Sequence, residues 1–339
     1  MKLSWQPYRL RLRAPLATAH GELREREGFL VQVDEGRGEA CPLPAFGTED
    51  LAACAGALVR AAEMLAPLPP PSRIEDIALD LHDAPAARHG VELALLDLLA
   101  RRRGMPLARL LDPRAVAQVP VGALLSAREP AALAREARSA AFEGFGTVKL
   151  KVAGAPLADD LARAAVVRDA AGPAVRLRLD ANGGWSEQQA ADALSRLARL
   201  DVELCEEPVS GVAALRRLRA AAPVRIAADE SVAGAGEELL DAVDAIVLKP
   251  MVLGGLLPAL DWARRARRRG LQTVVTTSLD GAIARLGAAH LAAALLAGGP
   301  APDAGLATGR LLDGDVCDDP APPSGGRISL PGAPGLGLP

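Results

Sequence analysis

The chain has 339 residues, and half of them are hydrophobic, which is enough to fill a large core. Its 39 Lys and Arg residues nearly balance its 42 Asp and Glu residues, and only 2% of the residues are aromatic. A dedicated nucleic-acid binder usually carries a basic face and stacking aromatic side chains, so we expect no nucleic-acid partner. The length predicts two domains, or one barrel with a smaller domain.

Four cysteines are scattered along the chain without a C-x-x-C pair, which argues against a disulfide framework and against a zinc ribbon. Residues 1–20 contain no apolar segment of the signal-peptide type. The longest uncharged stretch, residues 286–302, is too short and too weakly apolar to span a bilayer. We therefore expect a cytoplasmic protein with no membrane partner, and the sequence does not indicate its oligomeric state.

The first third of the chain mixes strand and helix patterns. Residues 3–13 alternate between apolar and polar side chains and residues 29–33 form a short apolar run, so both predict strands. One helix is predicted from residue 48 to about residue 65, where a proline-rich run must end it, and a second over residues 88–103. These elements predict an α+β domain over residues 1–115.

A coarse repeat begins near residue 116, where short β-branched runs alternate with helical segments rich in Ala, Leu and Arg. The runs cover residues 119–125, 147–152, 175–182, 202–208, 224–231, 245–251, 273–280 and, weakly, 305–308. Their spacing of about 20–30 residues is that of one strand and one helix of a barrel, and no Gly-rich phosphate loop favours a doubly wound sheet instead. We predict an α/β fold: a (β/α)7–8 TIM-type barrel over residues 116–318, followed by a tail over residues 319–339 that packs on the N-terminal domain.

Carboxylates end three successive predicted strands. Asp180, Glu206 and Asp229 lie 26 and 23 residues apart, which is close to one barrel unit each. Barrel enzymes build their active sites at this rim. Each residue alone is explained as well by a helix cap, but three in phase are not. Because neighbouring carboxylates repel one another, we predict a hard divalent cation between them, Mg²⁺ with Mn²⁺ as a substitute.

Lysines flank these carboxylates on both sides. Lys149 and Lys151 are two residues apart, so on a strand they point to the same face, and Lys249 ends an apolar run. Two ammonium groups so close together are expected to lower each other's pKa toward neutrality, which suits a general base. An alternative for Lys249 is a salt bridge to Glu230 or Glu207, and that bridge is compatible with a catalytic role.

These residues carry a resemblance to a known family. In order and with barrel spacing, the chain contains Lys149-x-Lys151, Asp180-Ala-Asn182, Glu206-Glu207-Pro208, Asp229-Glu230-Ser231 and Lys249-Pro250. The series resembles the signature of the muconate-lactonizing-enzyme subgroup of the enolase superfamily.

The resemblance implies an N-terminal capping domain over the barrel mouth and a small-molecule carboxylate substrate that loses a proton α to its carboxylate. It implies Mg²⁺ on Asp180, Glu206 and Asp229, with Lys151 and Lys249 as the catalytic lysines on opposite faces of the substrate. The supporting residues that it implies are Lys149, Asn182 and Glu230.

Within the subgroup, the sequence is most similar to the o-succinylbenzoate synthase family, through residues 26–31, 38–44, 278–280 and 305–309. That similarity implies a dehydratase that forms o-succinylbenzoate from 2-succinyl-6-hydroxy-2,4-cyclohexadiene-1-carboxylate in menaquinone biosynthesis. The substrate contacts that it implies are His20, Ser278 and Asp280.

Two features keep an alternative open, a racemase or epimerase of N-acyl amino acids or dipeptides. Dipeptide epimerases show an Asp-x-Asp pair at the eighth strand, which residues 305–308 lack, whereas Asp313 and Asp315 have the spacing but lie beyond that strand. After Asp280 the chain reads Gly-Ala-Ile-Ala, where the synthases tend to show Thr-Ser. A non-catalytic barrel protein is a third reading, but it would gain nothing from an intact triad and two lysines.

Overall fold

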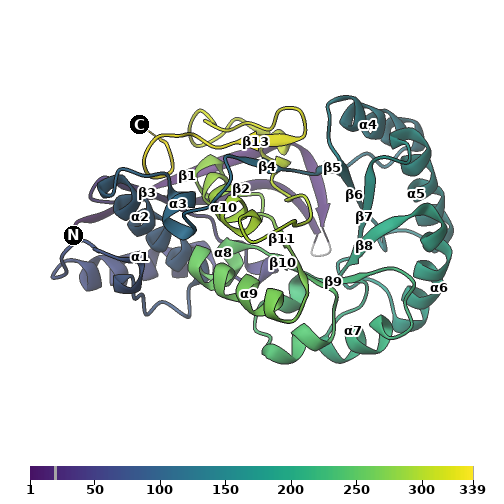
Figure 1. Ribbon diagram of the computed structural model, residues 1–339, viewed down its shortest axis with the longest axis horizontal. Helices are drawn as coiled ribbons and strands as arrows, with labels where there is room; N and C mark the ends of the chain where they lie inside the picture. Colours follow the sequence, from purple (N-terminus) through teal and green to yellow (C-terminus); the bar gives the residue numbers. More distant parts are fainter. Residues whose placement is uncertain (19–20, 339) are drawn as a thin grey trace.

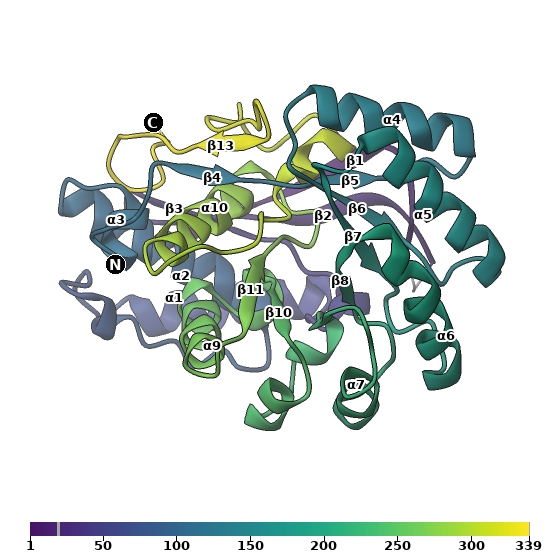
Figure 2. The same ribbon diagram turned by 45° about the vertical axis from the view of Figure 1, so that its right-hand side comes forward.

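Two main sheets organise the protein. Its structure is a computed structural model that describes residues 1–18 and 21–338. The first is a four-stranded antiparallel sheet in the order β12-β1-β2-β3, and the second is a seven-stranded parallel sheet in the order β11-β10-β9-β8-β7-β6-β5. The parallel sheet curls so that its helices lie on the outside, and the β1–β2 hairpin reaches toward its open inner side (Figure 1; Figure 2).

The antiparallel sheet is built from the N-terminal strands β1 (Leu3–Thr18), β2 (Gly21–Val33) and β3 (Gly36–Ala40). The alternation in β2 buries Phe29, Val31 and Val33 on the side where helix α2 packs. The remaining elements of this part are η1 (Pro44–Phe46), α1 (Leu51–Leu65), η2 (Ile74–Asp76), α2 (Pro85–Arg102) and α3 (Leu107–Leu111). Both predicted strands and both predicted helices are present.

The parallel sheet follows the predicted repeat. Its strands are β5 (Ala123–Leu125), β6 (Thr147–Lys151), β7 (Arg176–Asp180), β8 (Val202–Glu206), β9 (Ile226–Ala228), β10 (Ala245–Leu248) and β11 (Gln272–Val275). The segments between and after them form α4 (Pro130–Phe142), α5 (Leu157–Ala171), α6 (Glu187–Leu197), η3 (Ala198–Leu200), α7 (Val212–Arg219), η4 (Glu230–Val232), η5 (Glu237–Asp241), α8 (Pro250–Leu253), α9 (Leu256–Arg268) and α10 (Ala282–Leu296). The predicted barrel with an N-terminal α+β part is therefore confirmed.

The prediction of an eighth strand over residues 305–308 is wrong. Residues Ala304 and Gly305 form only isolated bridges, with Ala304 N–H donating to Pro120 O at 2.9 Å and Gly305 N–H donating to Val275 O at 2.8 Å. Gly305 fits there because a Cβ would lie 2.5 Å from Thr276 Oγ1. The chain then turns at once into η6 (Ala307–Leu311), so two residues close the barrel.

The tail returns to earlier parts of the chain. β12 (Leu312–Asp313) pairs with β1, and β13 (Arg327–Ser329) pairs with β4 (Gln118–Pro120) outside the barrel sheet. Further on, Leu336 N–H donates to Asp97 Oδ1 of α2 at 2.6 Å. Domain boundaries at residues 115 and 318 stay predictions.

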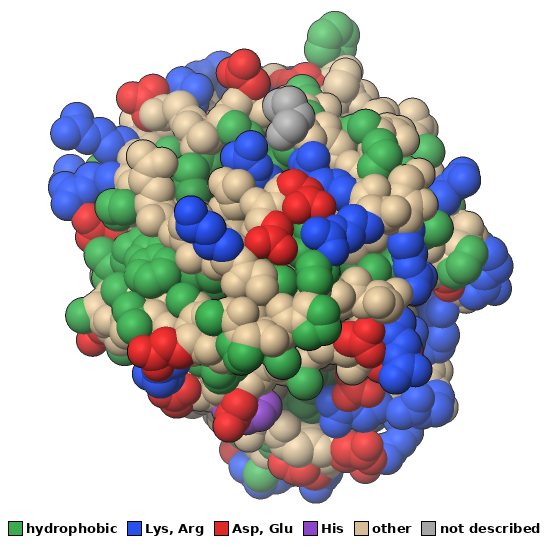
Figure 3. Space-filling view, turned by 90° about the vertical axis from the view of Figure 1, so that its left-hand side faces the viewer, with side chains coloured by type: hydrophobic (Ala, Val, Ile, Leu, Met, Phe, Trp, Pro, Cys, Tyr) green, Lys and Arg blue, Asp and Glu red, His purple; other side chains and the backbone are tan. Residues whose placement is uncertain are grey.

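Acidic, basic and apolar side chains mix over the face formed by the N-terminal part (Figure 3). Among the described residues, no helix has both the length and the apolar character that a bilayer span requires.

Candidate active site

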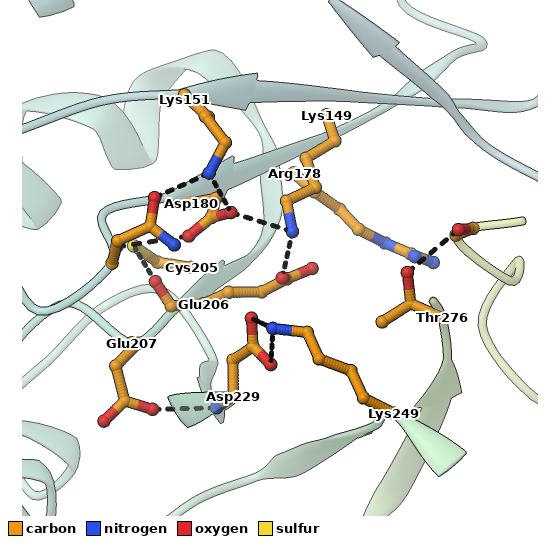
Figure 4. Close-up of polar contacts among 12 residues, drawn as sticks. Lys149, Lys151, Arg178, Asp180, Cys205, Glu206, Glu207, Asp229, Lys249 and Thr276 are labelled. Atoms are coloured by element: carbon orange, nitrogen blue, oxygen red, sulfur yellow. Dashed lines mark hydrogen bonds and ion pairs between the residues drawn. The ribbon is translucent and has the colours of Figure 1, made fainter. Parts of the chain in front are cut away.

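The predicted site residues meet at the carboxyl ends of β6 to β10. In the strand register, Lys151 lies beside Asp180 and Asp180 beside Glu206, so parallel pairing alone brings these side chains to one edge. Asp229 follows β9, and Lys249 follows β10 as the residue before α8. Lys149 and Lys151 approach the carboxylates from one side and Lys249 from the other (Figure 4).

The lysines neutralise the carboxylates in this arrangement. Lys149 Nζ lies 2.9 Å from Asp180 Oδ2 and also contacts Glu206 Oε2. Lys151 Nζ donates to Asn182 Oδ1 at 2.7 Å and to Asp180 Oδ2 at 3.2 Å. Lys249 Nζ lies 2.7 Å from Asp229 Oδ1, so its salt bridge is made with Asp229 and not with Glu230 or Glu207, the partners that the alternative named.

The expectation that Lys149 has a lowered pKa is wrong. Burial alone would lower the pKa of Lys149, but the carboxylates of Asp180 and Glu206 raise it above its ordinary value. The pKa of Asp180, which burial alone would raise, is lowered by Lys149 and Lys151. The attraction of the carboxylates that converge here outweighs the repulsion between the two neighbouring ammonium groups, on which the expectation rested.

The residues present fit a hard divalent cation. One oxygen from each of Asp180, Glu206 and Asp229 lies within 4.8 Å of the others, and all three side chains are buried. The donor set consists of carboxylate oxygens, which Mg²⁺ prefers, and contains no imidazole or thiolate that would favour zinc. We therefore regard this triad as a candidate magnesium site.

Side chains around the triad fix its loops. Asn182 Nδ2 donates to Glu230 Oε1 at 2.9 Å, which joins two of the three predicted supporting residues. Glu207 accepts from Asp229 N–H at 2.7 Å and from Ser231 N–H at 3.3 Å. The sequence analysis considered Glu207 only as a salt-bridge partner of Lys249 and missed this role, although its position directly after Glu206 was a signal.

The predicted substrate contacts separate in the structure. His20 lies outside the described residues. Ser278 lines the cavity above the triad, whereas Asp280 is buried behind that wall and accepts from Ser278 N–H at 3.3 Å. Burial raises the pKa of Asp280 to about 7.

The sequence analysis missed several other lining residues. The apolar ones include Leu16, Phe46, Leu124 and Leu279. Arg178 lines the cavity floor and donates to Glu203 Oε2 and to Asp303 O, both at 2.6 Å. A signal for Arg178 was its position two residues before Asp180, which puts both side chains on one face of β7.

The Asp-x-Asp spacing beyond the eighth strand position does not lead into the cavity. Asp315 accepts from Ala282 N–H at 2.6 Å and pairs with Arg285 at 2.7 Å, and Asp313 is an exposed residue of β12. The end of the eighth strand position instead offers Thr308, whose hydroxyl lies 2.9 Å from that of Thr277.

Known proteins share this fold. Residues 132–339 match the family model described as "Enolase C-terminal domain-like", so the chain belongs to the enolase superfamily. The muconate lactonizing enzyme of Pseudomonas fluorescens, solved with muconolactone, superposes with a TM-score of 0.88 and 26% identity, over 100% of this chain and 95% of that one. The predicted resemblance is confirmed.

Individual relatives differ in activity at similar identity. The o-succinylbenzoate synthase of Thermobifida fusca is 34% identical over 326 residues, which is 93% of this chain and 85% of the relative. The L-Ala-D/L-Glu epimerase of Bacillus subtilis is 33% identical over 261 residues, or 75% and 70%. Family membership therefore defines the class of enzyme and leaves the reaction to be argued from the site.

Proposed function

We propose that the protein is a Mg²⁺-dependent o-succinylbenzoate synthase, a carbon–oxygen lyase that acts in the cytoplasm on 2-succinyl-6-hydroxy-2,4-cyclohexadiene-1-carboxylate. The observation that carries the proposal is the end of the eighth strand position. Among the described residues, the cavity there is lined by Gly305, Ala307 and Thr308 and offers no carboxylate. A substrate with a free ammonium group would lack a counter-ion at this wall. The cyclohexadiene carboxylate has no ammonium group and needs no such counter-ion.

The two lysines have different tasks in this reaction. Unprotonated Lys151 removes the α-proton, the electron pair of the broken C–H bond forms the new C=C bond, and the hydroxide leaves with its own electron pair. The Lys151 ammonium then donates its proton to that hydroxide, which departs as water. Lys249 stays protonated on the opposite side and stabilises the negative charge on the substrate carboxylate in the transition state. When bound at Asp180, Glu206 and Asp229, Mg²⁺ would supply further positive charge to that carboxylate.

Substitution of each lysine tests these tasks. Loss of a general base costs about 10²–10⁴-fold in rate, so Lys151→Ala should abolish measurable aromatic product. Lys249→Arg keeps the positive charge but cannot shuttle protons at neutral pH, so it should retain some dehydration. Aromatic product is followed by absorbance, and α-deuterium incorporation from D₂O is followed by mass spectrometry.

The alternative is a racemase or epimerase of N-acyl amino acids or dipeptides, and the placement of Lys151 and Lys249 on opposite sides of the carboxylates favours it. Such an enzyme needs both lysines as bases, so Lys249→Arg would lose racemisation but still exchange one enantiomer through Lys151. If the wild type exchanges both enantiomers of an N-acyl amino acid and forms no aromatic product, the synthase proposal is wrong.

Removal of the metal tests the triad. Excess chelator should abolish turnover, and Mg²⁺, or Mn²⁺ in its place, should restore it. Asp229→Asn should bind Mg²⁺ more weakly in isothermal titration calorimetry, because it removes one of three anionic ligands. Full activity in excess chelator would contradict the metal assignment.

A further inference from the structure

Phe46 belongs to the N-terminal part of the chain and contacts Lys249, a proposed catalytic lysine of the barrel. The Lys249 ammonium nitrogen lies 4.8 Å from the centroid of the Phe46 ring, a distance at which the ring face attracts a cation. Both side chains line the cavity. The other described partner of this ammonium group is Asp229, whose carboxylate oxygens a bound cation would share.

We propose that Phe46 is a positioning residue that holds the Lys249 ammonium group toward the cavity. The inference rests on the proposed function, in which Lys249 acts as a cation. A ring face attracts an ammonium group through its quadrupole and accepts no proton. The ring therefore takes up no N–H group of Lys249, and those that do not point to Asp229 can face negative charge that develops on the substrate.

The loop that carries Phe46 is braced. Gly47 ends η1 with φ of +97°, in the left-handed region that favours glycine, and its N–H donates to Pro44 O at 3.0 Å. Leu43 N–H donates to the buried hydroxyl of Thr48 at 2.5 Å. Glu49 accepts from Ala87 N–H of α2 at 2.8 Å.

The two ends of the contact are also tied to each other. Cys41 N–H, just before the loop, donates to Met251 Sδ at 3.4 Å. Met251 belongs to α8, and Lys249 is the residue that precedes this helix. The position of the Lys249 ammonium group therefore depends on how the N-terminal part packs on the barrel.

Substitution of Phe46 tests the proposal. Phe46→Leu keeps an apolar side chain and removes the ring, so it should lower kcat about 2- to 30-fold, the range of cation–π energies. Phe46→Tyr keeps the ring face and should lose less activity than Phe46→Leu. Phe142→Leu makes the same change at a side chain that is 93% exposed, outside the cavity, and should leave kcat unchanged. In a Lys249→Met background, Phe46→Leu should cause no further loss.

A measurement without substrate tests the contact itself. With ¹³C-labelled lysine, the ε-methylene protons of Lys249, assigned by their absence in Lys249→Met, should be shifted upfield by the ring in the wild type. Phe46→Leu should remove this shift, and Phe46→Tyr should keep it. An unchanged signal in Phe46→Leu would overturn the proposal, as would equal losses of kcat in the Leu and Tyr variants. If the wild type turns over neither substrate class, the proposed function fails, and the resonance shift still decides the contact.

Discussion

Glu207 is a residue through which three strand ends are joined. Its side chain accepts from the N–H groups of Asp229 and Ser231, and its own carbonyl accepts from Gly183 N–H at 2.6 Å. Its φ of +37° lies in the left-handed region, which costs a residue with a Cβ of order 1–3 kcal/mol. The loops that carry Asn182 and Asp229 therefore both depend on one strained, buried glutamate.

Glu207→Gln should weaken Mg²⁺ binding although it replaces none of the three proposed metal ligands. A neutral amide makes weaker hydrogen bonds to the Asp229 and Ser231 N–H groups, because bonds to charged groups contribute about 1.5–3 kcal/mol and neutral ones about 1 kcal/mol. We expect the Mg²⁺ dissociation constant to rise about tenfold in isothermal titration calorimetry. Glu129→Gln, at an exposed position before α4, serves as the matched control. Equal affinities in the two variants would show that Glu207 does not position Asp229.

At the scale of single residues, the sequence predicted the site residues that recur at the ends of successive barrel strands. Asp180, Glu206 and Asp229 could be found because each ends a strand and the strands recur at one interval. Phe46 and Lys249 are separated by some two hundred residues, and nothing in either local pattern indicates their contact. The direction of a pKa shift likewise depends on distances that only the folded chain supplies: Lys149 lies 2.9 Å from Asp180, and the carboxylates raise its pKa.

Side chains from β3 and from the loop after β12 cap the N-terminus of helix α10. Glu39 of β3 accepts from Gly281 N–H at 2.6 Å and from Ala284 N–H at 2.9 Å, while Asp315 accepts from Ala282 N–H. The Tyr8 hydroxyl donates to Glu39 at 2.6 Å. Acidic side chains at a helix N-terminus satisfy free N–H groups and face the positive end of the helix dipole. This cap fastens the N-terminal sheet to the barrel.

Glu39→Ala should destabilise the protein by about 3–5 kcal/mol, because it leaves two helix N–H groups and the Tyr8 hydroxyl without their partner in a buried site. Urea unfolding followed by circular dichroism measures the loss. Glu35→Ala removes an exposed ion pair with Arg102 and should cost less than about 1 kcal/mol. A loss for Glu39→Ala no larger than that of this control would contradict the role of the cap.

Periodicity predicted the barrel elements that have neighbours on both sides. The strands from β6 to β10 are parallel and mostly buried, and short β-branched runs spaced by helical segments identify them. The prediction for the eighth position was wrong because single bridges at residues 304–305 contact both edges of the sheet. Two residues can make these bridges without the run of apolar residues that a full strand has. The pairing of β13 with β4 was not predictable for a related reason, since short edge pairs leave little trace in composition.

Over the whole molecule, buried His290 joins the barrel to the tail. Its Nδ1 accepts from Ala108 N–H of α3 at 3.1 Å, and its Nε2 lies 3.4 Å from Leu336 O. The neutral ring with a proton on Nε2 satisfies both contacts, whereas a second proton on Nδ1 would face the Ala108 N–H group. Burial lowers the pKa of His290 from 6.5 to about 4.

This shift predicts a loss of stability in acid. Between pH 6.5 and pH 4 the unfolded chain protonates His290 and the folded protein does not, so the free energy of unfolding falls as the pH falls. The wild type should therefore lose about 2–3 kcal/mol more than His290→Gln between pH 7 and pH 4.5, since the other titrating groups are common to both. Urea unfolding of both proteins at the two pH values measures the difference. Parallel pH dependence would mean that folding does not lower the pKa of His290.

The return of the tail to α2 and β4 also sets an order of events during biosynthesis. The hydrogen bond from Leu336 to Asp97 spans 239 residues, and β13 supplies the strand partner of β4. A growing chain emerges from the ribosome with its N-terminal residues first. Until residues 327–338 have been translated, α2 therefore lacks its hydrogen bond from Leu336 and β4 lacks its pairing with β13. Messages truncated before that point should yield chains that a protease cleaves readily around residues 97–120, while the released full-length chain resists cleavage there.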